Sequence, residues 1–255
     1  MNHKVKIAIL GDSISQGIGK KKVNYIQSLQ KKLGEKYEIH NFACTGTTIH
    51  YALEQLESIK ILKPNIIIIM YGNVDAQIRP NINGKKHKIS RIIPKRYKMN
   101  GMLDPRPFYS KKWYRKLPDR LDNIARYIIR KIVTKTEGVC QWVPIYEFNK
   151  KYKEFLDGIN EDNIKIFLVS TIRLDESYYP GCIEQYKVYN ESIKLLSKNK
   201  NCEYIDLFSY IDNLLIDNEW NDIFYFDHYH PNENGYEFIA ELLSNHIISK
   251  GDNDE

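Results

Sequence analysis

The sequence carries a serine, a histidine and an aspartate whose settings suit nucleophilic catalysis. Ser13 comes just after Gly11, which ends the apolar run 6–10, and Asp227 precedes His230 by three residues. A serine nucleophile needs a base within hydrogen-bond reach, and the base needs an acceptor that orients it. Asp227 and His230 can supply both from one loop, which Pro231 stiffens. A serine after a strand is also an ordinary helix N-cap, so position alone leaves both roles open for Ser13.

Two further loops carry groups that suit an oxyanion hole. Gly46 lies in the small-residue loop 43–48, where its N–H can approach a developing oxyanion beside the N–H of Ser13. The run Gly72-Asn73-Val74-Asp75 adds a side-chain amide. His228 competes with His230 as the base, and the two histidines with Asp227 also resemble a metal cluster. No other concentration of ligands supports a metal.

The hydrophobic pattern predicts the elements that must position these groups. Five short apolar runs predict strands at 6–10, 37–42, 65–71, 163–170 and 202–207. Helical spacing predicts helices at 23–33, from the loop 43–48 to about Lys60, at 117–135, 143–156 and 184–198, and after Gly235 to about Ile248. Alternating strands and helices predict an α/β protein with a parallel sheet, whose functional groups gather at the carboxyl ends of the strands.

These short motifs together resemble the sequence blocks of the SGNH/GDSL hydrolase family, which are numbered here in chain order. The first block, Gly11-Asp12-Ser13 with Ser15 and Gly17, matches it, as do Gly46 and the final Asp227-x-x-His230. The resemblance implies a flavodoxin-like three-layer α/β/α sandwich with a five-stranded parallel sheet. It also implies a Ser13-His230-Asp227 triad acting on esters, and no metal or organic cofactor.

The third block departs from the family pattern Gly-x-Asn-Asp. Val74 stands where the family has its oxyanion-hole asparagine, and Asn73 stands one residue early. A one-residue shift at a strand end turns a side chain to another side. We therefore expect Ser13 and Gly46 to form the hole, with Asn73 contributing only if its loop is locally rearranged.

A basic segment interrupts this pattern. Residues 79–135 hold 18 Lys and Arg against 3 Asp and Glu, whereas the rest of the chain holds 20 against 29. We predict one domain, residues 1–250, with this segment as a partly helical insertion and 251–255 as a frayed tail. The stripe at Leu117, Leu121, Ile124, Ile128 and Ile132 either packs on its own domain or presents a basic surface to an anionic ligand, a glycan carrier or a membrane face.

Other features bound compartment and partners. Four scattered cysteines (Cys44, Cys140, Cys182, Cys202), without a CxxC pair, are typical of reduced thiols in the cytoplasm. No apolar run is long enough to span a membrane. Basic residues around Tyr109 and Trp113 resemble single-stranded nucleic-acid surfaces, but no recognisable module or nucleotide motif accompanies them, so we expect no nucleic acid.

The sequence thus predicts a cytoplasmic serine esterase or acyltransferase that acts on a short acyl ester of a carbohydrate, chiefly O-acetyl. The enzyme alternative is a lysophospholipase or thioesterase with longer acyl chains. A hypothesis of another class is a hydrolytically weak scaffold that binds a glycan or partner through the basic insertion. The choice between water and another acyl acceptor is open.

Overall fold

The computed structural model describes residues 4–19, 23–83, 89–98, 101–159, 163–198 and 201–251. Most of the tail predicted to be frayed lies outside these residues.

A five-stranded parallel sheet forms the centre of the molecule. Its strands lie in the order β2 (Tyr37–Asn41), β1 (Val5–Gly11), β3 (Ile66–Met70), β6 (Lys165–Val169) and β7 (Cys202–Ile205). All five residues of β3 are buried, which explains why that run is apolar without alternation. The predicted strands and the predicted fold class are confirmed.

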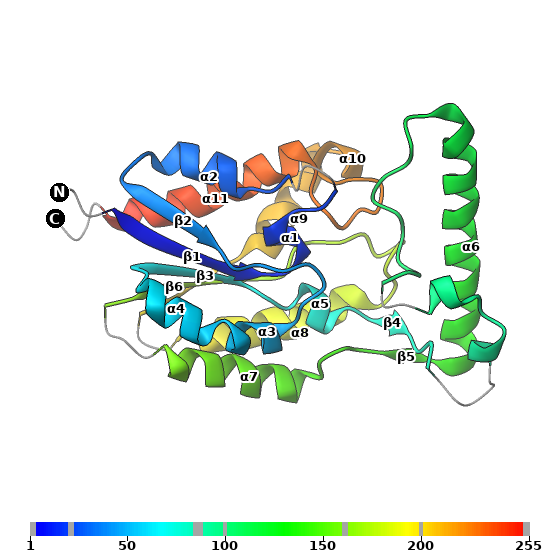
Figure 1. Cartoon of the computed structure of the whole chain (residues 1–255), viewed down its shortest axis with the longest axis horizontal. Helices are drawn as coiled ribbons and strands as arrows, with labels where there is room; N and C mark the ends of the chain where they lie inside the picture. Colours follow the sequence, from blue (N-terminus) through cyan, green and yellow to red (C-terminus); the bar gives the residue numbers. More distant parts are fainter. Residues whose placement is uncertain are drawn as a thin grey trace.

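Helices cover both faces of this sheet (Figure 1). One face carries α2 (Ile26–Leu33) and α11 (Glu233–Gly251), which pack against each other. The other carries α3 (Ile49–Glu54), α4 (Leu56–Leu62), α7 (Ile145–Gly158) and α8 (Cys182–Leu196). The helix predicted after the loop 43–48 is thus two helices, divided at Gln55. Two helices after β7 were not predicted: α9 (Leu207–Asp217) and α10 (Trp220–Ile223).

The basic segment forms a separate structure beyond the carboxyl ends of the strands (Figure 1). At its base, β4 (Arg79–Pro80) pairs antiparallel with β5 (Val139–Cys140). Between them lie two short 3₁₀ turns, η1 (Ile89–Arg91) and η2 (Lys95–Tyr97), and the long helix α6 (Trp113–Glu137). A small apolar cluster of Ile93, Tyr97, Leu103 and Val133 holds them together.

Helix α6 is longer than the pattern predicts. It begins at Trp113 rather than at Leu117, so Pro118 lies inside it. Proline lacks a backbone N–H, and at this position the missing group is the one that would donate to the carbonyl of Tyr114, just after the first four N–H groups, which have no partner within any helix. Pro118 therefore removes just one early hydrogen bond, and the helix extends beyond it.

Candidate active site

Ser13 is the first residue of the short helix α1 (Ser13–Gln16), directly after β1. Asp12 caps this helix, because its side chain accepts a hydrogen bond of 2.9 Å from the N–H of Ile14. A Cβ atom at Gly11 would lie 2.7 Å from Oγ of Ser15 and 3.0 Å from the carbonyl oxygen of Met70, so a larger residue would crowd this turn. The cap is therefore Asp12, which leaves the hydroxyl of Ser13 free for another role.

Three predicted residues lie in hydrogen-bond contact. Nε2 of His230 lies 3.0 Å from Oγ of Ser13, and Nδ1 of His230 lies 2.6 Å from Oδ2 of Asp227. Oδ1 of Asp227 accepts the backbone N–H groups of Tyr229 and His230, which fixes the carboxylate in its own loop. Because an ionised carboxylate only accepts, this contact assigns the imidazole proton to Nδ1 and leaves Nε2 to accept from Ser13.

The backbone N–H groups of Ser13 and Gly46 are the two candidate backbone donors to an oxyanion. No hydrogen bond among the described residues uses either N–H. Gly46 has φ +75, a conformation that favours glycine. Its loop is tied to α1, since Oε1 of Gln16 accepts from both the N–H and the hydroxyl of Thr45. Two donors are thus available at this edge of the sheet.

Asn73 begins α5 (Asn73–Ala76) and is fully buried. Its Oδ1 accepts the N–H of Ile172 at 2.7 Å, and its backbone carbonyl accepts from the hydroxyl of Tyr186. Its Nδ2 has no hydrogen-bond partner of normal length among the described residues, although the amide lies close enough to Asp12 to lower the pKa of that carboxyl. The bond to Ile172 therefore fixes the amide, with Nδ2 close to Asp12.

Two buried carboxyl groups lie beneath these loops. Burial raises the pKa of Asp75 to about 7, although its carboxylate accepts the N–H groups of Ile49 and Gly72, which lower it. Burial likewise raises the pKa of Asp12 to about 6, against the lowering effects of the Ile14 N–H and the Asn73 amide. Asp75 thus joins the third block to α3 through its two hydrogen bonds with Gly72 and Ile49.

His228 forms a second histidine–aspartate pair in the loop that carries Asp227 and His230. Its Nδ1 lies 2.7 Å from Oδ2 of Asp175, and its ring stacks between Tyr178 and Trp220 at centroid distances of 4.5 and 5.4 Å. No hydrogen bond among the described residues joins His228 to Ser13. The structure therefore brings His230, and not His228, to the serine.

The basic insertion forms one wall beside this loop. The N–H of Phe226 donates to the carbonyl of Pro107 at 3.3 Å. Phe108 packs edge-on against Tyr225, with ring centroids 4.6 Å apart, and Tyr109 packs against Phe226 at 5.2 Å. Residues flanking Asp227 are thus held by the insertion, so this segment belongs to the surroundings of the site.

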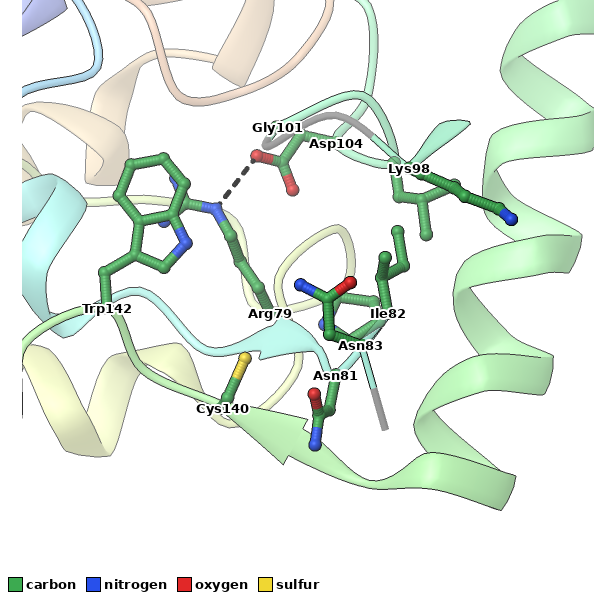
Figure 2. A pocket seen from close by; sticks show the side chains of 11 residues that line it. Arg79, Asn81, Ile82, Asn83, Lys98, Gly101, Asp104, Cys140 and Trp142 are labelled. Atoms are coloured by element: carbon green, nitrogen blue, oxygen red, sulfur yellow. Dashed lines mark hydrogen bonds and ion pairs between the residues drawn. The ribbon is translucent and has the colours of Figure 1, made fainter. Parts of the chain in front are cut away.

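Arg79 connects the third block to the insertion (Figure 2). Its guanidinium lies 4.0 Å from the ring centre of Trp142, and its Nε lies 3.4 Å from Oδ2 of Asp104. It also donates to the carbonyl of Val74 and to Gln77. The side chain is almost buried, so its main contacts are internal, at the edge of a cavity of about 210 Å³.

Sequence reasoning did not find Asp175, Tyr178 or Trp220. Asp175 lies a few residues beyond β6, at the carboxyl edge where functional groups of such sheets gather, and that position was the available signal. Tyr178 and Trp220 carried no pattern that separates them from the many other aromatic residues.

Comparison with known proteins agrees with the fold. Residues 9–238 match the model of the GDSL-like lipase/acylhydrolase family. A lipase/acylhydrolase from Enterococcus faecalis has a similar structure, with TM-score 0.61, 16% identity and 96% of each chain covered. A catalytic mutant of the acetylxylan esterase Axe2 from Geobacillus stearothermophilus is also similar, with TM-score 0.58, 13% identity, and 95% of this chain and 94% of that chain covered.

No curated protein matches the sequence. The family model nevertheless spans nearly the whole chain, and the similar structures have the same arrangement of sheet and helices. The chain therefore belongs to the GDSL-like lipase/acylhydrolase family of carboxylic ester hydrolases.

Proposed function

We propose that the chain is a serine esterase that removes, or transfers, a short acyl group, chiefly O-acetyl, on a carbohydrate. The observation that carries the proposal is the unbroken contact from Asp227 through His230 to Oγ of Ser13. Such a relay activates a serine hydroxyl that is otherwise a weak nucleophile.

In the proposed mechanism, Oγ of Ser13 attacks the acyl carbon while its proton passes to Nε2 of His230. Asp227 stabilises the imidazolium through Nδ1–H. The N–H groups of Ser13 and Gly46, together with Nδ2 of Asn73, receive the oxyanion. The tetrahedral intermediate then expels the alcohol, which takes the proton from His230. Water or another alcohol attacks the acyl-enzyme, gives its proton to His230, and the proton returns to Ser13 as the product leaves.

A carbohydrate alcohol is supported by the surface around the loop. The rings of Tyr178 and Phe226 are exposed there, and aromatic rings are common in the walls of ligand pockets. Two acetylxylan esterase variants from Geobacillus stearothermophilus, acting on an acetylated polysaccharide by name, are among the similar structures. At 13% identity they support the substrate class only loosely.

A second candidate is hydrolysis of longer acyl esters, as in a lysophospholipase or thioesterase. The observation that favours it is a cavity of about 340 Å³ between α6 and the loop 177–180. Ile78, Pro80, Tyr127, Val139 and Pro180 form its apolar part, and Tyr178, which stacks on His228, also lines it. This groove suits an acyl chain better than a sugar.

Labelling with a serine-directed fluorophosphonate, followed by mapping of the modified residue, tests the mechanism. We expect modification at Ser13 and no labelling of Ser13→Ala or His230→Ala. A chain-length series of 4-nitrophenyl esters then separates the substrates, because the proposal expects the highest kcat/KM with acetate. Absence of labelling and of turnover would favour a scaffold that binds through the insertion.

We propose that the protein is cytoplasmic, because its cysteines do not form disulfides. All four cysteines are free, and proteins of oxidising compartments commonly use theirs in disulfides. Separately, none of the helices within the described residues has the length and apolar character to cross a membrane.

A further inference from the structure

Helix α6 presents an unpartnered apolar stripe to solvent. Successive stripe residues lie three or four positions apart, so they share one side of the helix. Their exposed fractions run from 46 to 84%, although large apolar side chains are usually buried. The stripe consists of Trp113, Leu117, Leu121, Ile124, Ile128 and Ile132.

The opposite side of α6 packs against the insertion itself. Val133 is buried in the small apolar cluster, and Asp122 binds Arg106, which precedes the helix, at 2.9 Å. Asp119 accepts from Arg106 and from the N–H of Ser110. These contacts fix the rotation of the helix, so the apolar stripe faces outward in the folded protein.

Basic side chains border the stripe. Arg120, Lys131 and Lys135 are exposed, and each lies three or four residues from a stripe residue. Lys131 and Lys135 also lie at the edge of the cavity between α6 and the loop 177–180. Lys116 and Arg115 extend this basic region at the start of the helix. No ion pair within the described part of the chain engages any of the five. The acidic residues Asp119 and Asp122, by contrast, are turned inward, so the outer surface of α6 is both apolar and cationic.

An apolar cleft adjoins this stripe near the end of α6. It has a volume of about 300 Å³, and only isoleucine, valine and proline residues line it, including Ile132 of the stripe. Ile92, at its rim, is 83% exposed. The apolar surface thus widens beyond the helix.

We propose that the outer face of α6 docks on an anionic lipid bilayer. Helices that lie in the membrane interface combine an apolar face with Lys and Arg, and Trp and Tyr concentrate at this depth. Trp113 and the neighbouring Tyr114 are exposed at the first turn of α6. Since α6 stands at the end of the molecule away from the sandwich, the sandwich does not hinder contact between this face and a flat surface (Figure 1).

Charge favours a bilayer over a second copy of the chain. Packing α6 against α6 of another molecule would bring two cationic surfaces together, and the acidic groups of this helix are already engaged internally. Anionic headgroups supply the missing negative charge, and each Lys or Arg near them adds to the attraction. The proposal does not depend on which ester the enzyme cleaves.

Co-sedimentation of the full chain with vesicles tests this docking. We expect binding to equal mixtures of phosphatidylcholine and phosphatidylglycerol, at least roughly tenfold weaker binding to phosphatidylcholine alone, and weakening by salt. Vesicle binding should also shift the tryptophan emission to the blue, and Trp113→Phe should remove the shift. Leu117→Glu with Ile124→Glu should lower affinity at least roughly tenfold, because both apolar contacts are lost.

A matched control separates docking from general charge effects. Ile61→Glu with Ile216→Glu adds the same charge at residues that are 82 and 78% exposed on α4 and α9, and it should leave vesicle binding nearly unchanged. Equal weakening by both pairs would overturn the proposal, as would absence of binding. Light scattering gives the remaining outcome: a dimer that only the α6 pair dissociates, without vesicle binding, would identify the face as a self-association surface instead.

Discussion

His230 Nε2 lies 3.0 Å from Ser13 Oγ, although 217 positions separate the two residues. Ser13 is delivered by the carboxyl end of β1, and His230 by the loop before α11. That loop is closed at its base, since the N–H of Tyr225 donates to the carbonyl of His230 at 2.9 Å. Both partners are therefore held by backbone structure before any substrate binds, which is the preorganisation that catalysis requires.

Asp227→Asn should lower kcat by roughly 10⁴-fold and change KM little, because an amide no longer fixes the imidazole in the required tautomer. Steady-state kinetics with 4-nitrophenyl acetate measure this. The control is Asp175→Asn, which removes the same kind of contact from His228. It should keep kcat within about tenfold, because His228 is not the base. Equal losses in the two variants would contradict the assignment of His230.

Asn73→Ala should lower kcat by roughly 10²–10³-fold if Nδ2 donates to the oxyanion as proposed. It also removes the bond to the N–H of Ile172, at a cost of about 1–3 kcal/mol in unfolding free energy. Asn190→Ala is the matched control, because Oδ1 of Asn190 accepts the adjacent N–H of Thr171 at 2.8 Å.

The two asparagine variants should therefore lose similar stability in urea denaturation, while only Asn73→Ala loses much kcat. Should their kcat values fall together, Asn73 is a structural residue and the oxyanion hole has two donors.

The positions of Ser13, Gly46 and the pair Asp227–His230 could be predicted because strand ends in a parallel sheet share one edge. Asn73 shows where this reasoning stops. The spacing of the third block predicted that the Asn73 side chain turns away from the oxyanion hole. In the structure its direction depends on the hydrogen bond from the N–H of Ile172, a residue that follows another strand. Such contacts between distant segments leave no local pattern.

The insertion was less predictable for the same reason. Its charge identified the segment, but not the pairing of Arg79 with Cys140 in β4 and β5. The apolar stripe of α6 correctly predicted a helix but not what the stripe contacts, because apolar residues at helical spacing occur both on helices that face a core and on helices that bind a partner. The structure turns that stripe outward through ion pairs between the other side of α6 and the preceding segment, such as Asp122 with Arg106.

Asp75 should make stability depend on pH. Burial raises its pKa in the folded protein to about 7, above the value of 3.8 expected when it is exposed. The folded state thus binds more protons than the unfolded state between these values, and this contribution to stability is lost as pH rises from about 4 to about 7. Urea denaturation across this range should show the wild type losing stability relative to Asp75→Asn. Parallel curves would indicate that Asp75 does not titrate in this window.

Arg79→Lys should destabilise the junction between the third block and the insertion. Lysine cannot reproduce the planar fork that contacts Asp104, Val74 and Gln77 while stacking on Trp142. Breaking such a buried pair costs roughly 3 kcal/mol.

Urea denaturation and limited proteolysis of the insertion measure that loss. The control is Arg96→Lys, whose side chain is 66% exposed and lies 3.7 Å from Asp122. Because exposed ion pairs contribute about 0–1 kcal/mol, this control should leave both measurements nearly unchanged. If Arg79→Lys also leaves unfolding in urea and proteolysis of the insertion unchanged, the insertion is held by its apolar cluster and by β4–β5 pairing alone.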